Sequence, residues 1–193
     1  MIIDFDISII LIQFFVFILI SIYLKVKKKK ENVYFIFLFV MFVYILNVSK
    51  LTIFPIYVNL PFPKNISSSM NFIPFKNMFC KESLLNVIMT IPLGFGIPFI
   101  SKKYTYKSIS IMGIIFGICI EAIQYIEALI AKGFTMRFID INDVIFNFLG
   151  TILGFVLLKL VSIFYLKLNK SKLNIFWNYI YGICSKLEPK FKF

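Results

Sequence analysis

The polar residues between positions 121 and 147 have the types and the spacing to form a binding site. Four of the nine acidic residues of the chain lie there: Glu121, Glu127, Asp140 and Asp143. The stretch also contains Arg137, the only arginine among 21 basic residues. Carboxylates can hold a cation, ligate Mg²⁺ or serve as general acid and base. A guanidinium can hold a carboxylate or phosphate through two parallel hydrogen bonds.

The spacing of these residues predicts two helices that each present a polar face. Glu121 and Gln124 are three residues apart, so they share a face of the first helix. Five residues at intervals of three or four follow one face of the second helix: Asp140, Asp143, Asn147, Gly150 and Gly154. Two structural alternatives remain open. Asp140 and Asp143 could simply cap the helix, where a carboxylate complements the helix dipole, or the polar groups could only lock the helices together.

The rest of the composition narrows the chemistry. The chain has no histidine, which removes histidine-based triads, the usual zinc sites and imidazole general bases. Its three cysteines, Cys80, Cys119 and Cys184, show neither a disulfide framework nor the spacing of a metal site. We therefore expect no metal and no cofactor.

The composition predicts an all-α membrane protein. Hydrophobic residues make up 60% of the 193 residues and charged residues only 16%, so a soluble fold would expose far too much apolar surface. The net charge of +12 comes from lysines that lie in short clusters between apolar runs. Such clusters set membrane topology, and we do not expect nucleic acid as a partner.

Five apolar stretches are long enough to span a membrane: residues 7–24, 33–54, 84–100, 109–125 and about 141–166. With the N-terminus outside, fifteen lysines lie on the cytoplasmic side, while six basic residues and seven of the nine acidic residues lie outside. This agrees with the positive-inside rule. Acidic residues precede the first stretch and lysines follow it, the reverse of a signal peptide, so we expect a retained helix in a multi-pass protein of the cell membrane.

The predicted organisation has three parts. Residues 1–54 form two N-terminal transmembrane helices, residues 55–166 form an outer loop with three further helices, and residues 167–193 form a basic tail. The tail mixes lysines with Trp177 and tyrosines and contains no complete span. We therefore expect it to be an amphipathic segment at the inner membrane surface.

Small residues and prolines mark the expected helix contacts. Pro92, Gly94 and Pro98 predict a third helix that is kinked or locally unwound and faces the bundle interior, because proline removes backbone hydrogen bonds. Gly113 and Gly117 are spaced for close helix packing, as are Gly150 and Gly154. Glu121 falls in the outer half of its span, so it should face the bundle and have a partner.

The ordered pattern of these residues resembles the VanZ-like family over residues 71–154. The matching features are Asn71-x-x-Pro74-Phe75, Asn86, Pro92-x-Gly94, Glu121-x-x-Gln124, Arg137 and the series from Asp140 to Gly154. The resemblance implies a small bacterial integral membrane protein of the Gram-positive cell envelope that raises tolerance to the lipoglycopeptide teicoplanin.

Seven polar residues are the candidate ligand-binding residues at the outer face: Asn86, Glu121, Gln124, Arg137, Asp140, Asp143 and Asn147. They fit three functions. A non-enzymatic envelope protein would bind the antibiotic or a lipid-linked peptidoglycan precursor among membrane lipids. An enzyme would act on a lipid or phosphoester at the outer leaflet, although the residues for catalysis are few. A small transporter or flippase would need the broken third helix and a polar path to the cytoplasm.

Overall fold

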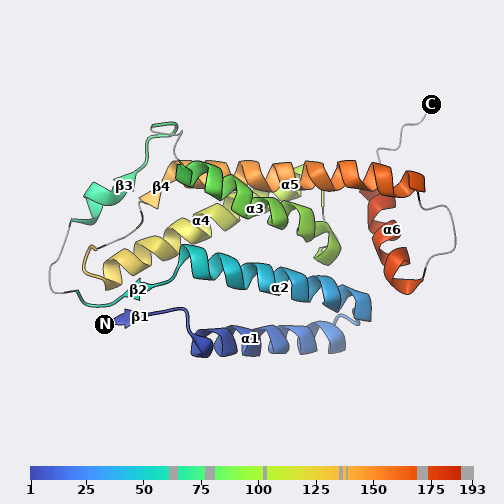
Figure 1. Ribbon diagram of the computed structural model, residues 1–193, viewed down its shortest axis with the longest axis horizontal. Coiled ribbons are helices and arrows are strands. Elements are labelled where there is room, and N and C mark those ends of the chain that lie inside the picture. The colour runs from blue at the N-terminus through green and yellow to red at the C-terminus, as the bar shows by residue number, and fades with distance from the viewer. Residues whose placement is uncertain are drawn as a thin grey trace.

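The computed structural model describes residues 1–60, 65–76, 81–101, 104–134, 137, 139–168 and 174–187. Cys80, Lys102 and Lys103 lie outside these residues, as do residues 169–173 and 188–193 of the basic tail. The described chain forms six α-helices, shown in Figure 1: α1 (Ile7–Val26), α2 (Asn32–Thr52), α3 (Lys81–Ile100), α4 (Tyr106–Ile130), α5 (Ile141–Leu168) and α6 (Ile175–Leu187).

The first five helices are long and apolar enough to span a membrane. They coincide with the five predicted stretches. α1, α3, α4 and α5 each run two or more residues beyond at least one predicted end, while α2 begins one residue earlier and ends two residues earlier than predicted. α1 buries none of its residues against the rest of the protein, although it is apolar on all sides. A helix of this kind is stable only in hydrocarbon. The prediction of an all-α membrane protein is therefore confirmed.

Local signals set the helix ends. α1 begins after Asp6, whose carboxylate accepts hydrogen bonds from the amides of Ser8 and Ile9. α4 begins with a capping box between Thr105 and Ser108. The turn after α4 contains Gly133 with a φ of 87°, a conformation that glycine adopts without strain.

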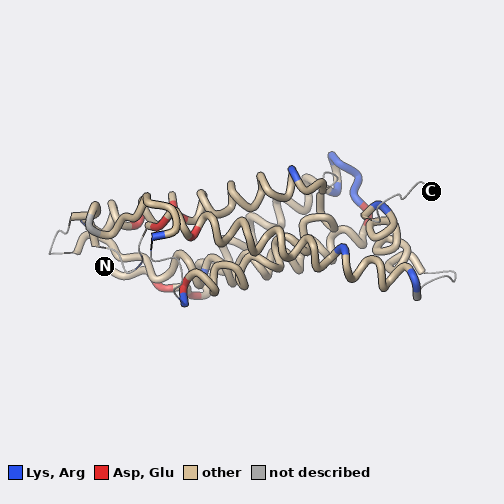
Figure 2. Tube along the Cα trace, turned by 90° about the horizontal axis from the view of Figure 1, so that it is seen from above, with Lys and Arg blue, Asp and Glu red and all other residues tan. Residues whose placement is uncertain are grey.

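The helices run in alternating directions, so successive connections between them lie at opposite ends of the bundle. Acidic and basic residues are divided between these two ends. Figure 2 shows acidic residues gathered at one end of the bundle and lysines gathered at the other. We call the first the acidic end; α1, α3 and α5 begin there, and α2 and α4 finish there. This separation is what the positive-inside pattern requires. That the acidic end faces outward stays a prediction.

α3 packs most extensively against α5, and glycines make the close approach possible. A Cβ at Gly94 would overlap the carbonyl oxygen of Thr151, and a Cβ at Gly154 would overlap that of Ile91. Gly150 likewise lies against the backbone of Val87. The two helix backbones are therefore in direct contact, as in other small-residue membrane interfaces.

α4 packs against α5 through the other glycine pair. A Cβ at Gly117 would lie 3.0 Å from the Cα of Val144, and one at Gly113 would lie 2.9 Å from the Cβ of Thr151. The predicted packing glycines thus lie in the two interfaces of α5: Gly150 and Gly154 in its contact with α3, and Gly113 and Gly117 in its contact with α4. This helix is the centre of the bundle.

α3 remains one continuous helix through Pro92 and Pro98. Of the two predicted alternatives, the local unwinding is therefore wrong, and the kink stays a prediction. Prolines are tolerated in membrane helices where neighbouring helices supply packing and hydrogen bonds. Here the hydroxyl of Tyr44 in α2 donates to the carbonyl of Met89, 3.1 Å away and three residues before Pro92.

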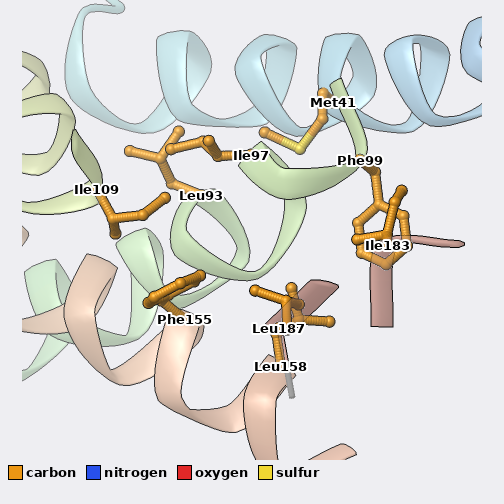
Figure 3. Packing of buried hydrophobic residues seen from close by; sticks show 9 residues of the cluster. All are labelled: Met41, Leu93, Ile97, Phe99, Ile109, Phe155, Leu158, Ile183 and Leu187. Atoms are coloured by element: carbon orange, nitrogen blue, oxygen red, sulfur yellow. The ribbon is translucent and has the colours of Figure 1, made fainter. Parts of the chain in front are cut away.

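Away from the acidic end, the bundle is held by an apolar core (Figure 3). Nine buried residues from five helices contribute to it: Met41, Leu93, Ile97, Phe99, Ile109, Phe155, Leu158, Ile183 and Leu187. The last two come from α6, whose Trp177 and Tyr181 are exposed. The described part of the tail is thus an amphipathic helix with one face on the core.

A hydrogen bond also fixes α6 to the end of α3. The hydroxyl of Tyr179 donates to the carbonyl of Phe99 across 2.6 Å. Burial raises the pKa of Tyr179 to about 12, so the hydroxyl keeps its proton at physiological pH.

Two short strand pairs tie the loops together at the acidic end. β1 (Ile2–Ile3) pairs antiparallel with β2 (Ile56–Tyr57), and β3 (Met70–Asn71) pairs parallel with β4 (Ile139–Asp140). Neither pair was predicted from the sequence. Strands of two residues carry no periodicity that could reveal them.

Candidate functional site

The second strand pair positions Asp140 at the centre of a hydrogen-bond network. Asn71 and Asp140 are partners in the register of β3 and β4. The amide nitrogen of the Asn71 side chain donates to Oδ1 of Asp140 across 2.9 Å, and the backbone amide of Asn142 donates to the same oxygen across 2.8 Å. Asp140 thus caps α5, as the structural alternative anticipated, and it also holds the loop before α3.

Glu121 joins this network from α4. Its Oε2 accepts a hydrogen bond from the backbone amide of Asp140, 2.9 Å away. The side chain is only 8% exposed, so it faces the bundle as expected. Its other oxygen, Oε1, is buried and has no hydrogen-bond partner among the described residues. A buried oxygen without a partner costs free energy, which a polar ligand would recover.

Asp143 and Asn86 bring α5 and α3 into the same group. The side chain of Asn86 lies close enough to the carboxylate of Asp143 to stabilise its charged form. The charges that act on Asp143 are those of Asp140 and Glu82, and those that act on Glu121 are Asp143 and Asp140. We call Asn71, Asn86, Glu121, Asp140 and Asp143 the acidic group.

Asn142 is a residue that sequence reasoning missed. It is 2% exposed, and both ends of its side chain are bonded. Its Oδ1 accepts from the amide of Phe75 across 2.7 Å, and its Nδ2 donates to the carbonyl of Lys76 across 2.9 Å. The side chain therefore fastens the loop with the Asn71-x-x-Pro74-Phe75 pattern to α5. It lies off the polar stripe of α5, so its spacing gave no signal.

Arg137 and Gln124 form a different group at the end of α2. Nη2 of Arg137 donates to the carbonyls of Leu51 and Phe54, each across 3.0 Å. Nε2 of Gln124 donates to the carbonyl of Thr52 across 3.1 Å. The last carbonyls of a helix lack partners within it, and a cation complements its dipole there. All seven predicted residues lie toward the acidic end. Two of them, Arg137 and Gln124, bind the end of α2.

A small cavity adjoins this second group. Its volume is about 20 Å³, and Glu127 and Arg137 supply the charged part of its lining. The charge of Arg137 acts on Glu127. The cavity is large enough for one water molecule. Arg137 thus interacts with Glu127 and with the end of α2, which are not part of the acidic group.

Asn147 lies deeper between α4 and α5. It is 1% exposed, and neither its oxygen nor its nitrogen has a partner among the described residues. A Cβ at Gly117 would lie 3.3 Å from the Cβ of Asn147, which places Asn147 against α4 one turn below Glu121. The amide is therefore another buried polar group whose hydrogen bonds are not made among the described residues, and Oε1 of Gln124 and Oε1 of Glu127 are open in the same way.

The model of the VanZ/LLP1 family matches residues 8–163, from the start of α1 into α5. The match covers most of the chain and extends beyond residues 71–154 to include the first two helices. No significant match is found among the curated proteins or among the solved structures. The protein belongs to the VanZ/LLP1 family.

Proposed function

We propose that this membrane protein contributes to resistance against teicoplanin and related glycopeptides by binding the drug, or a lipid-linked cell-wall intermediate, at the acidic group. Family membership supports the general role. The observation that carries the site is the open hydrogen-bonding capacity of Glu121, whose Oε1 is buried without a partner among the described residues.

The way the group is built also supports a binding role. Residues from α3, α4, α5 and the β3–β4 pair meet there. Most of their polar groups interact with another member of the group. Such interactions hold the remaining open groups in fixed positions, which lowers the entropy lost on binding.

The two alternative functions, a transporter and an enzyme, have less support. A transporter was suggested by a broken third helix, and α3 is continuous. An enzyme acting on a lipid phosphate would use the carboxylates of Glu121 and Asp143 as acid and base. Catalysis would need the phosphate itself between these carboxylates, whose negative surroundings disfavour an anionic group, whereas a lipid-linked intermediate would bind there through another of its polar groups.

The test is the inhibitory concentration of teicoplanin and of vancomycin in a susceptible Gram-positive host. The host expresses wild type, Glu121→Gln or Glu127→Gln at matched membrane levels. We expect wild type to raise the teicoplanin value selectively and Glu121→Gln to remove the rise, because a charge-assisted hydrogen bond is worth about tenfold or more in affinity.

Glu127→Gln is the matched control. It is the same change on the same helix, but Glu127 lies beside Arg137 and outside the acidic group. It should keep resistance. No rise with well-expressed wild type would refute the resistance role, and equal resistance in both variants would refute the site.

A further inference from the structure

An apolar groove lies between α2 and α3, away from the acidic group. Its volume is about 420 Å³, and its exposed lining is apolar. The lining comes from residues 37–44 of α2 and 91–99 of α3. Met41 reaches from α2 toward α3 (Figure 3), and a Cβ at Gly96 would overlap its sulfur, so the two helices touch within the groove. Val40 and Pro92 in the lining are exposed, so the groove opens toward lipid.

The groove has the depth of one membrane leaflet. Its α3 side, from Ile91 to Phe99, is about 12 Å long at about 1.5 Å per residue. Half of a hydrocarbon core of about 30 Å is about 15 Å. Phe37 lies near the start of α2 and Phe99 near the end of α3, which places the groove in the leaflet at the lysine end. At the other end of the groove, Tyr44 links the two helices, because its hydroxyl donates to the carbonyl of Met89.

These dimensions suit a hydrocarbon chain better than a partner helix. A volume of about 420 Å³ over a length of about 12 Å gives a cross-section of about 35 Å². A helix about 10 Å wide needs about 80 Å². A methylene group is similar in volume to a water molecule, about 30 Å³, so the groove holds about fourteen of them. This is the size of a single fatty-acyl chain.

Positive charge lies at the end of the groove where the headgroup of such a lipid would be. Nζ of Lys30 lies 4.1 Å from the centre of the Tyr34 ring. Tyr34 and Phe37 are three residues apart on α2, so they share a face. Lys25 is held at the same helix start, where its Nζ donates to Oδ1 of Asn32. Two ammonium groups therefore lie within one or two helical turns of the groove.

We propose that this groove binds an acyl chain of an anionic glycerophospholipid, whose headgroup lies at the start of α2 beside Lys30. A phosphatidylglycerol-type headgroup carries a net negative charge, and lysines near the membrane surface attract it more strongly than a zwitterionic one. The stacked rings of Phe37 and Phe99, whose centres are 4.5 Å apart, provide a rigid apolar surface for the chain. This site goes beyond the proposed function and uses none of the residues of the acidic group.

The experiment is photo-crosslinking of the full-length protein in phosphatidylcholine vesicles. One set of vesicles contains phosphatidylglycerol with a diazirine in its acyl chain, and the other contains phosphatidylcholine with the same labelled chain. Mass spectrometry identifies the labelled peptides. We expect the phosphatidylglycerol probe to label residues 37–44 and 91–99 at least about fivefold more than the phosphatidylcholine probe, because one lysine near the surface is worth about that factor in affinity.

The exposed face of α5 around Val161 is the internal reference, and the two probes should label it within about twofold of each other. Equal labelling of the groove by the two probes would overturn the proposal. Labelling of the groove that does not exceed that of the α5 face would also overturn it. Labelling that falls as more protein is packed into each vesicle would replace the lipid with a second copy of the chain.

A variant that fills the groove locates the binding. Val40→Trp should reduce labelling of residues 91–99 by the phosphatidylglycerol probe at least about fivefold, because the indole takes the place of the chain. Val161→Trp on α5 is the matched control, since Val40 is 57% and Val161 50% exposed and both lie toward the lysine end. It should leave this labelling unchanged. Val40→Phe takes the place of Val40→Trp if thermal unfolding shows that the latter is not folded. Undiminished labelling in the folded variant would refute the site.

A second variant tests the headgroup without altering the groove. Lys30→Gln should lower the preference for phosphatidylglycerol over phosphatidylcholine to about that of the α5 face, while Lys167→Gln at the end of α5 should leave the preference intact. A full preference in Lys30→Gln would contradict the assignment of the headgroup to the start of α2.

Discussion

Arg137 shows at the residue scale that the type of a side chain does not reveal its partner. Its identity as the sole arginine indicated a special role, and its Nη2 does bond two acceptors at once. Those acceptors are carbonyls at the end of α2. They lie 86 and 83 residues away in the chain, so no local pattern could point to them.

Arg137→Met should destabilise the protein by about 2 kcal/mol, because two hydrogen bonds of about 1 kcal/mol each are lost. The change also leaves Glu127 without the positive charge that acts on it. Arg137→Lys keeps the charge, so its stability should lie between that of wild type and that of Arg137→Met. The measurement is thermal unfolding of the purified variants. A ligand affinity that dropped while the unfolding temperature stayed constant would instead assign Arg137 to ligand binding.

The α3–α5 pair decides the geometry of the site at the scale of the elements. Glycines let the two backbones touch, and this contact brings Asn86 of α3 to Asp143 of α5. The strand pair β3–β4 then adds Asn71 from the loop before α3. The acidic group is therefore assembled by helix packing and loop pairing together.

Gly150→Ala should lower the stability of the bundle by at least about 1–3 kcal/mol, since the new methyl group would overlap the backbone of Val87. Gly182→Ala in α6 is the matched control. A Cβ at Gly182 meets nothing within 4 Å, and alanine favours the helix. Unfolding temperatures in detergent compare the two. Equal temperatures for wild type and Gly150→Ala would show that α3 and α5 are not in such close contact.

The separation of charge along the bundle is the main feature of the whole molecule. Acidic residues gather at the end that contains the candidate site, and lysines gather at the other (Figure 2). The positive-inside rule places the lysine end in the cytoplasm. A site for an extracellular drug or for an outer-leaflet lipid requires the same orientation.

An epitope before Met1 should therefore react with antibody in intact cells, and a fluorescent protein after Phe193 should fluoresce in the cytoplasm. Five spans place the two ends on opposite sides of the membrane. The reverse pattern would put the acidic group on the cytoplasmic side. That result would refute the proposed function without changing the fold.

Sequence by itself determined the class of the protein and the limits of its helices. Apolar length, lysine clusters and breaks such as Gly133 are local properties, and the cost of exposed apolar surface or unpaired backbone in lipid makes them decisive. The glycine spacing likewise identified the faces that pack closely. These features survive in the structure because each is fixed by residues within one or two helical turns.

Only the tertiary structure decided how the polar residues divide. Pairing of β3 with β4 joins Asn71 to Asp140, and the end of α2 takes Gln124 and Arg137 away from the carboxylates. Such partners lie far apart in the chain, and which of them meet depends on how the helices pack. Helical spacing shows which side chains share a face, but the choice of partner across that face is made by the packed bundle.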